Sequence, residues 1–352
     1  MVIKMDIKIK EEYLQQAMEL HQKNPVVDAH LDLAGEVLLR HQTGEQEVVK
    51  KYYLPHFKQA GMKLVVSSVY VESGNLDWGW ENALSQIAVL KKDISELDEV
   101  ILVQKRSDVD RLLQENKIGI LIYMEGLDCI GEDIDRLNVL YDLGVRGASL
   151  TWSRPNKLAV GCCKASEDRQ ITGSLSQAGV RAIKRLEELS MFLDVSHLND
   201  EGFAQVYQIA ERSFIATHSG SRQVYHNYRN LTDEQMKVLA SQGGIMGMNG
   251  CKYIVGSLSG NHLEMLCRHI EYEVEKVGAK HVGYGFDLCD SYSRASAALQ
   301  GKCYTDRDDC LLDHSQVPLV SAALLQRGMD TELVKGIMGG NFMGYFKGIL
   351  GQ

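Results

Sequence analysis

Short runs of apolar residues, separated by longer amphipathic segments, dominate the hydrophobic pattern of the chain. Eight of these runs are nearly continuous in apolar character, which is typical of parallel strands buried on both faces. The intervening segments carry apolar residues at helical spacing in several places. The expected strands are Val26–Asp32, Met62–Val71, Ile118–Gly126, Val145–Trp152, Phe192–Leu198, Phe214–Gly220, Gly243–Gly250 and His281–Leu288.

Helices are expected before and between these strands. Ser174 is the expected N-cap of one helix, and Thr232 with Gln235 has the spacing of a capping box in another. The clearest helical patterns cover Ile7–Lys23, Ser174–Ser190, Asn199–Arg212, Thr232–Gln242 and Asn261–Gly278.

Strands alternating with helices predict an α/β fold, a (β/α)8 TIM barrel that forms one domain over residues 1–352, with an N-terminal helix before the first strand. A doubly wound open sheet is the alternative. That fold would need a Gly-rich phosphate loop after an early strand, and the sequence has neither a G-x-G-x-x-G nor a Walker motif.

Composition and charge exclude several classes of protein. Apolar residues make up 45% and charged residues 24% of the 352 residues, as in ordinary soluble proteins. The net charge of −9 argues against a nucleic-acid partner, because such binding depends on basic surfaces. No apolar run approaches the length of a membrane span, so no membrane partner is expected. The charged N-terminal residues do not resemble an export signal, which predicts a cytoplasmic location.

Six side chains able to bind metals lie at the expected carboxyl ends of five strands, where barrel enzymes place their catalytic groups. Each one alone could be a helix cap or a hydrogen-bonding partner of the backbone. Together they converge, and three carboxylates buried in one place are costly unless cations neutralise them. We therefore expect two divalent ions, with Glu125 as the bridging ligand. The six residues are His30, Asp32, Glu125, His197, His218 and Asp287.

The same residues lie in motifs that resemble the membrane (renal) dipeptidase family of zinc peptidases, from about Val26 to Phe346. The motifs occur in the family's order, and the most specific is THSGSRQVYHNYRNLTDEQ. The others are VVDAHLDL, IYMEGLD, LDVSHL, HVGYGFDL and IMGGNFMGYF. The resemblance implies a barrel of the metal-dependent hydrolase type, two Zn²⁺ ions per subunit, hydrolysis of a small dipeptide substrate and, as in many members, a homodimer.

The resemblance also implies a role for each residue at the site. One zinc would be bound by His30 and Asp32, and the other by His197 and His218, with Glu125 as the catalytic bridge. A hydroxide held between the two ions would be the nucleophile.

Two further residues would act on the substrate in this scheme. Asp287 would accept the proton of the water and pass it to the leaving amine. Arg229 would hold the C-terminal carboxylate of the dipeptide with its planar guanidinium, unless it forms a salt bridge with Asp233 instead.

Two more candidates concern substrate choice. Trp152 stands where animal members of the family have a substrate-contacting histidine, and Tyr253 could donate a hydrogen bond to the substrate. The histidine replacement keeps open a related barrel hydrolase acting on another amide or a lactone, or a dipeptidase specialised for a D-residue or for Cys-Gly. A barrel that has lost catalysis and only binds is a third class, against which the complete set of six ligand-type residues argues.

Overall fold

The computed structural model describes residues 7–164, 166–304 and 307–351. The strands are β1 (Val26–Leu31), β2 (Met62–Tyr70), β3 (Val100–Leu102), β4 (Ile118–Glu125), β5 (Val145–Ser149), β6 (Phe192–Asp194), β7 (Ala216–Ser219), β8 (Met246–Met248) and β9 (Val282–Tyr284). The α-helices are α1 (Glu11–Lys23), α2 (Leu33–Gln42), α3 (Leu54–Ala60), α4 (Gly79–Ser95), α5 (Arg106–Gln114), α6 (Arg136–Asp142), α7 (Gln177–Glu188), α8 (Asp200–Ile209), α9 (Asp233–Ser241), α10 (Lys252–Val255), α11 (His262–Val277), α12 (Asp290–Leu299), α13 (Val317–Gln326), α14 (Thr331–Lys335) and α15 (Asn341–Ile349).

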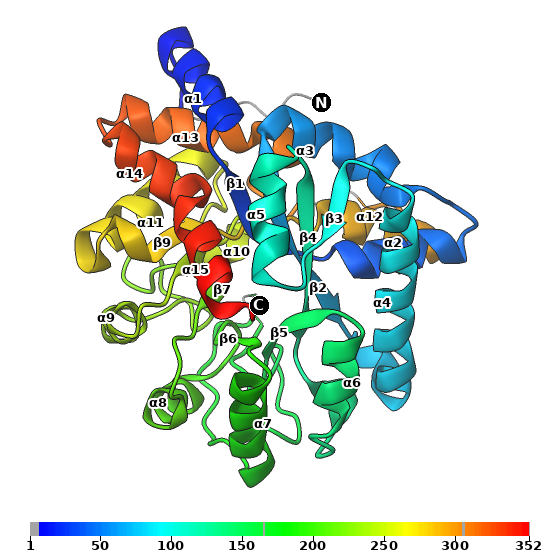
Figure 1. The fold of residues 1–352 in the computed structure, drawn as a ribbon. Helices are drawn as coiled ribbons and strands as arrows, with labels where there is room; N and C mark the ends of the chain where they lie inside the picture. The colour runs from blue at the N-terminus through cyan, green and yellow to red at the C-terminus, as the bar shows by residue number, and fades with distance from the viewer. Residues whose placement is uncertain (1–6, 165, 305–306, 352) are drawn as a thin grey trace.

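The strands form a parallel barrel surrounded by helices, which confirms the fold predicted from the sequence (Figure 1). Strands β1, β2, β4, β5 and β6 are hydrogen-bonded in this order, and β7, β8 and β9 continue the series. The amide of Val195 donates to the carbonyl of Ile215 at 2.8 Å and joins β6 to β7. The amide of Asp287 donates to the carbonyl of His30 at 3.2 Å and joins β9 back to β1.

The short strand β3 is an addition that the hydrophobic pattern did not predict. It pairs with the first half of β4, from Val100 opposite Ile118 to Leu102 opposite Ile120. Strand β5 pairs with β4 only from Ile122 onward, so β3 fills the position beside β4 before β5 begins. Its apolar run covers only Val100–Val103, which is shorter than each of the eight runs from which strands were predicted.

The helices expected from the sequence are all present, with small differences at their ends. Thr232 caps α9 as predicted, and its capping box with Gln235 is complete. The N-terminal helix begins at Glu11 rather than Ile7. The cap assigned to Ser174 is wrong: Ser176 accepts a hydrogen bond from the amide of Gly179 at 3.1 Å, because it directly precedes the first helical residue.

The interior of the barrel is closed at the amino-terminal ends of its strands by helix α15. The ring centroids of Phe192 and Phe346 lie 5.4 Å apart, and Phe342 stacks on Phe346 at 5.7 Å. At this end, the Tyr345 hydroxyl donates to the carbonyl of Ser213, which precedes β7. The apolar floor leaves the carboxyl ends of the strands as the accessible end of the barrel. None of the helices in the described ranges is both long and apolar enough to cross a membrane.

Candidate metal centre

The structure brings the six predicted metal-site residues together at the carboxyl end of the barrel. His30 and His218 lie on β1 and β7, and Glu125 is the last residue of β4. Asp32 directly follows β1, and His197 and Asp287 lie in the loops after β6 and β9. The convergence that the strand pattern predicted is therefore present, while the role of each residue stays a prediction.

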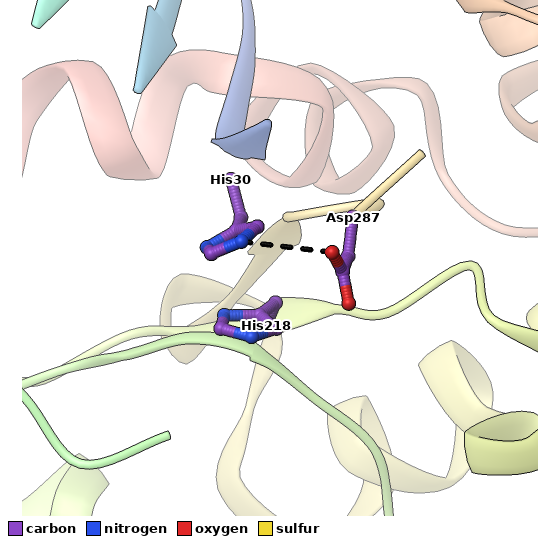
Figure 2. A group of neighbouring side chains, drawn as sticks. All are labelled: His30, His218 and Asp287. Atoms are coloured by element: carbon purple, nitrogen blue, oxygen red, sulfur yellow. Dashed lines mark ion pairs between the residues drawn. The ribbon is translucent and has the colours of Figure 1, made fainter. Parts of the chain in front are cut away.

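His30 is the centre of one half of the site. Its Nε2 lies 3.7 Å from an oxygen of Asp32 and 3.6 Å from an oxygen of Glu125 and of Asp287. Figure 2 shows its imidazole facing that of His218, with Asp287 beside both, and the two ring centroids are 3.6 Å apart. The Nε2 atom is buried and has no hydrogen-bond partner, so one strong ligand atom points at the carboxylates without a bond of its own.

Glu125 links this half of the site to the other. Its Oε2 faces His30, whereas its Oε1 lies 2.8 Å from Nε2 of His197 and 3.4 Å from Nε2 of His218. Three groups have ligand atoms within 4.8 Å of one another, and Glu125 belongs to two of them. The groups are His30 with Asp32 and Glu125, Glu125 with His197 and His218, and His30 with His218 and Asp287.

Two of the site residues have a left-handed backbone, with φ values of 69° for His197 and 56° for Asp287. This conformation is uncommon for residues other than glycine and costs energy. It turns the chain sharply after β6 and β9 and directs both side chains toward the centre. The expected strand over His281–Leu288 ends earlier, at Tyr284, so this turn rather than the strand register places Asp287.

Burial and mutual charge shift the pKa values of the site. Burial raises the pKa of Glu125 well above its usual value and that of Asp287 to about 6. Burial also lowers the pKa of His197 and of His218 well below the usual value. The pKa of His30, which burial alone would lower, is raised to about 10, chiefly by Glu125. These shifts have one cause, which is that three carboxylates and three imidazoles share a buried site, and positive charge there would favour the ionised carboxylates.

Each histidine of the site has a hydroxyl group on its other ring nitrogen, which the sequence analysis did not identify. The Tyr123 hydroxyl lies 2.7 Å from Nδ1 of His30, Ser153 Oγ 2.7 Å from that of His197, and Thr217 Oγ1 2.7 Å from that of His218. Tyr123 precedes Glu125 by two residues on β4, and this period-two spacing is a signal that could have revealed it. Such partners orient histidine ligands.

The three residues predicted to contact substrate line one cavity of about 460 Å³, together with four of the metal-site residues, Asp32, Glu125, His197 and Asp287. Arg229 is buried in its wall, Tyr253 is exposed on α10, and Trp152 is partly buried. The Trp152 ring lies between Tyr70 and His197, at centroid distances of 5.1 and 5.7 Å.

Arg229 is held by neutral oxygens rather than by a carboxylate. Its two Nη groups donate to Ser219 Oγ at 3.3 Å and to the carbonyl of His218 at 3.0 Å, and its buried Nε has no partner. The alternative salt bridge between Arg229 and Asp233 is not among the ion pairs of the described residues, and the Asp233 carboxylate accepts the Tyr272 hydroxyl at 2.9 Å instead. A buried guanidinium with a free donor beside the cavity fits an anionic ligand.

The sequence matches the model of one protein family, described as membrane dipeptidase (peptidase family M19), over residues 14–349. The chain belongs to the membrane dipeptidase family. Dipeptidase 3 of Mus musculus is 27% identical over 350 residues, which cover 95% of this chain and 66% of the mouse protein. A protein in the PQQ-III 3′ region of Acinetobacter calcoaceticus is 30% identical over 48% of this chain and 56% of its own length. The chain spans less than two thirds of both relatives.

Solved structures support the barrel expected of a membrane dipeptidase. A metallopeptidase from Rhodobacter sphaeroides, solved with a phosphinate mimic of L-Ala-D-Ala, superposes with a TM-score of 0.79 at 23% identity, over 92% of this chain and 99% of that chain. A metallopeptidase named dipeptidase AC gives a TM-score of 0.81 at 23% identity, over 94% and 99% of the two chains.

Proposed function

We propose that the chain is a dipeptidase that uses two zinc ions to hydrolyse the peptide bond of dipeptides. Family membership supports the dipeptidase class. The observation that supports the dinuclear site most directly is the position of Glu125, whose two oxygens face different ligand groups. A carboxylate in that position is suited to bridge two cations.

The residues present fit zinc. Imidazole nitrogens and carboxylate oxygens are common zinc ligands, and three of each meet here. The buried Nε2 of His30 has no hydrogen-bond partner, which a bound cation would supply. His30 and Asp32 would hold one ion, His197 and His218 the other, and Glu125 both. Ions in this set would polarise a scissile carbonyl and increase the acidity of a water molecule.

Asp287 is the residue we assign to proton transfer. Its Oδ2 accepts a hydrogen bond from Asn249 Nδ2 at 3.1 Å, which fixes the carboxylate, and its Oδ1 faces the centre near His30. A carboxylate held there can accept the proton of the attacking water at Oδ1 and deliver it to the leaving amine.

Arg229 is the residue we assign to the C-terminal carboxylate of the substrate. Its anchoring to Ser219 and to the backbone of His218 fixes its distance from the site. A cation at a fixed distance from the scissile bond would favour dipeptides over longer peptides, whose carboxylate lies further away. The small-molecule partner is therefore a free dipeptide.

Elemental analysis followed by a dipeptide panel tests the proposal. We expect two equivalents of zinc, turnover of at least one dipeptide and loss of turnover with a chelator that readded Zn²⁺ reverses. The panel pairs L- and D-residues at the C-terminus, and it includes L-Ala-D-Ala because the Rhodobacter neighbour was solved with a mimic of it. Blocked dipeptide amides, which lack the carboxylate, are the matched control. Chelator-resistant turnover, or no turnover with metal bound, would contradict the proposal.

The position of Trp152 supports a second candidate within the same chemistry. The indole occupies the cavity wall where the resemblance places a substrate-contacting histidine. A related amidase or lactonase, or a dipeptidase restricted to a D-residue or to Cys-Gly, would show as turnover of those compounds alone in the same panel. A homodimer and a cytoplasmic location also stay predictions.

A further inference from the structure

A buried carboxylate that the proposed mechanism does not use lies behind the metal centre. Asp194 is the last residue of β6 and is 2% exposed. Its Oδ1 accepts the amides of Ser196 and Thr217, both at 2.9 Å, and its Oδ2 accepts the Thr217 hydroxyl at 2.6 Å. No Lys, Arg or His of the described residues pairs with it, so these donors alone stabilise its charge.

Thr217 connects this carboxylate to one histidine of the site. Its fully buried Oγ1 lies 2.7 Å from Nδ1 of His218 and 3.5 Å from Oγ of Ser196.

The number of hydrogens along these bonds fixes the direction of the bond to His218. An ionised carboxylate only accepts, so the single hydroxyl hydrogen of Thr217 is directed at Asp194. Thr217 Oγ1 can then only accept from Nδ1–H of His218.

A neutral imidazole that carries its hydrogen on Nδ1 has a free lone pair on Nε2. In His218, Nε2 is the atom that faces Glu125. We infer that Asp194 is a positioning residue that sets the metal-binding tautomer of His218 through Thr217. His197 has a separate hydroxyl partner in Ser153. The inference rests on the proposed metal site but not on the identity of the substrate.

The Asp194→Asn variant tests the inference, because its amide can replace the acceptor facing Thr217 by a donor. The Asn oxygen keeps the two backbone amides, and its NH₂ group donates to Thr217 Oγ1. The hydroxyl hydrogen of Thr217 is then free to be donated to Nδ1 of His218, which favours the tautomer that carries its hydrogen on Nε2. We expect zinc affinity to fall about 10- to 100-fold in a competition assay with a chelating dye.

Nuclear magnetic resonance gives a second readout that does not depend on turnover. In the zinc-free protein with ¹⁵N-labelled histidine, we expect an Nδ1–H signal from His218. Asp194→Asn should remove this signal. Ser153→Ala is the matched control, which should affect His197 and leave His218 unchanged. Wild-type zinc affinity and an unchanged His218 signal in Asp194→Asn would overturn the inference, as would loss of the His218 signal in Ser153→Ala.

A second pair of variants covers the case in which Asp194→Asn does not fold. Thr217→Ser keeps the hydroxyl and should bind zinc as the wild type does, whereas Thr217→Val removes it and should bind about 10- to 100-fold more weakly. Equal zinc affinity of these two variants would also overturn the inference. None of these assays uses a dipeptide, so a failure to hydrolyse dipeptides would contradict the proposed function and leave the inference standing.

Discussion

Glu125 Oε1 lies 2.8 Å from Nε2 of His197, while the other oxygen of the same carboxylate faces His30 across the site. The two halves of the candidate metal centre therefore share one charged group. Replacing that group affects both halves, whereas replacing an outer histidine affects one.

The first prediction concerns this shared carboxylate. Glu125→Gln keeps the shape of the side chain and removes its charge, so we expect loss of at least one zinc equivalent. Dipeptidase activity should fall by about 10²-fold or more, which is typical for removal of a catalytic group. His197→Ala should lose one equivalent only. Zinc content is measured by elemental analysis after dialysis, and an unchanged stoichiometry in both variants would refute the ligand assignment.

The second prediction concerns Arg229. Arg229→Ala should raise KM for dipeptides and lower kcat/KM by about 10²- to 10³-fold, because a buried charged contact is worth roughly 2–4 kcal/mol. Zinc content should stay at the wild-type value. Arg229→Lys keeps the charge without the planar donor arrangement and should recover only part of the loss. Steady-state kinetics on one dipeptide and its amide measure the effect; zinc loss in Arg229→Ala would show that the residue supports the metal site instead.

The third prediction concerns Trp152, which lies between Tyr70 and His197 in the cavity wall. Trp152→His should change the ranking of dipeptides by kcat/KM without changing zinc content, because it replaces an apolar wall by a polar group. Trp152→Phe keeps an aromatic wall and should preserve the ranking. The dipeptide panel is the measurement, and identical rankings for all three proteins would remove Trp152 from the specificity residues.

The fourth prediction concerns stability in acid. Burial lowers the pKa of His21 and of His269 from 6.5 to about 4. Both rings are therefore neutral in the folded protein, while the unfolded chain binds protons below about pH 6.5. Their stabilising contribution is complete above pH 6.5 and is lost as the pH falls toward 4, by about 3 kcal/mol for each ring.

Urea unfolding between pH 4 and 7.5 tests this prediction. His21→Gln removes one titrating group, so the slope of unfolding free energy against pH should decrease by about 1.4 kcal/mol per pH unit below pH 6.5. Any acid release of metal affects both proteins alike, which makes the difference between their slopes the informative quantity. Parallel curves would show that His21 does not titrate as its burial requires.

The fold and the meeting of the six candidate ligand residues could be predicted because both follow from patterns along the chain. Buried parallel strands give continuous apolar runs, and polar residues at their ends, such as His30 and Glu125, are conspicuous against them. Strand β3 could not be predicted, because its apolar run covers only Val100–Val103 and is shorter than every run from which a strand was predicted. The roles of Ser153 and Thr217 also required the structure, since hydroxyl residues are common near strand ends and only the folded chain brings them to a ring nitrogen.

Helix α15 supplies the floor of the barrel, yet it follows every strand in the order of synthesis. On the ribosome, all six candidate ligand side chains therefore emerge before Phe342 and Phe346 can seal the opposite end. A chain that still lacks α15 leaves the apolar interior of the barrel uncovered at that end, and uncovered apolar surface favours aggregation. Folding of the barrel thus depends on a segment at the end opposite to the candidate metal centre.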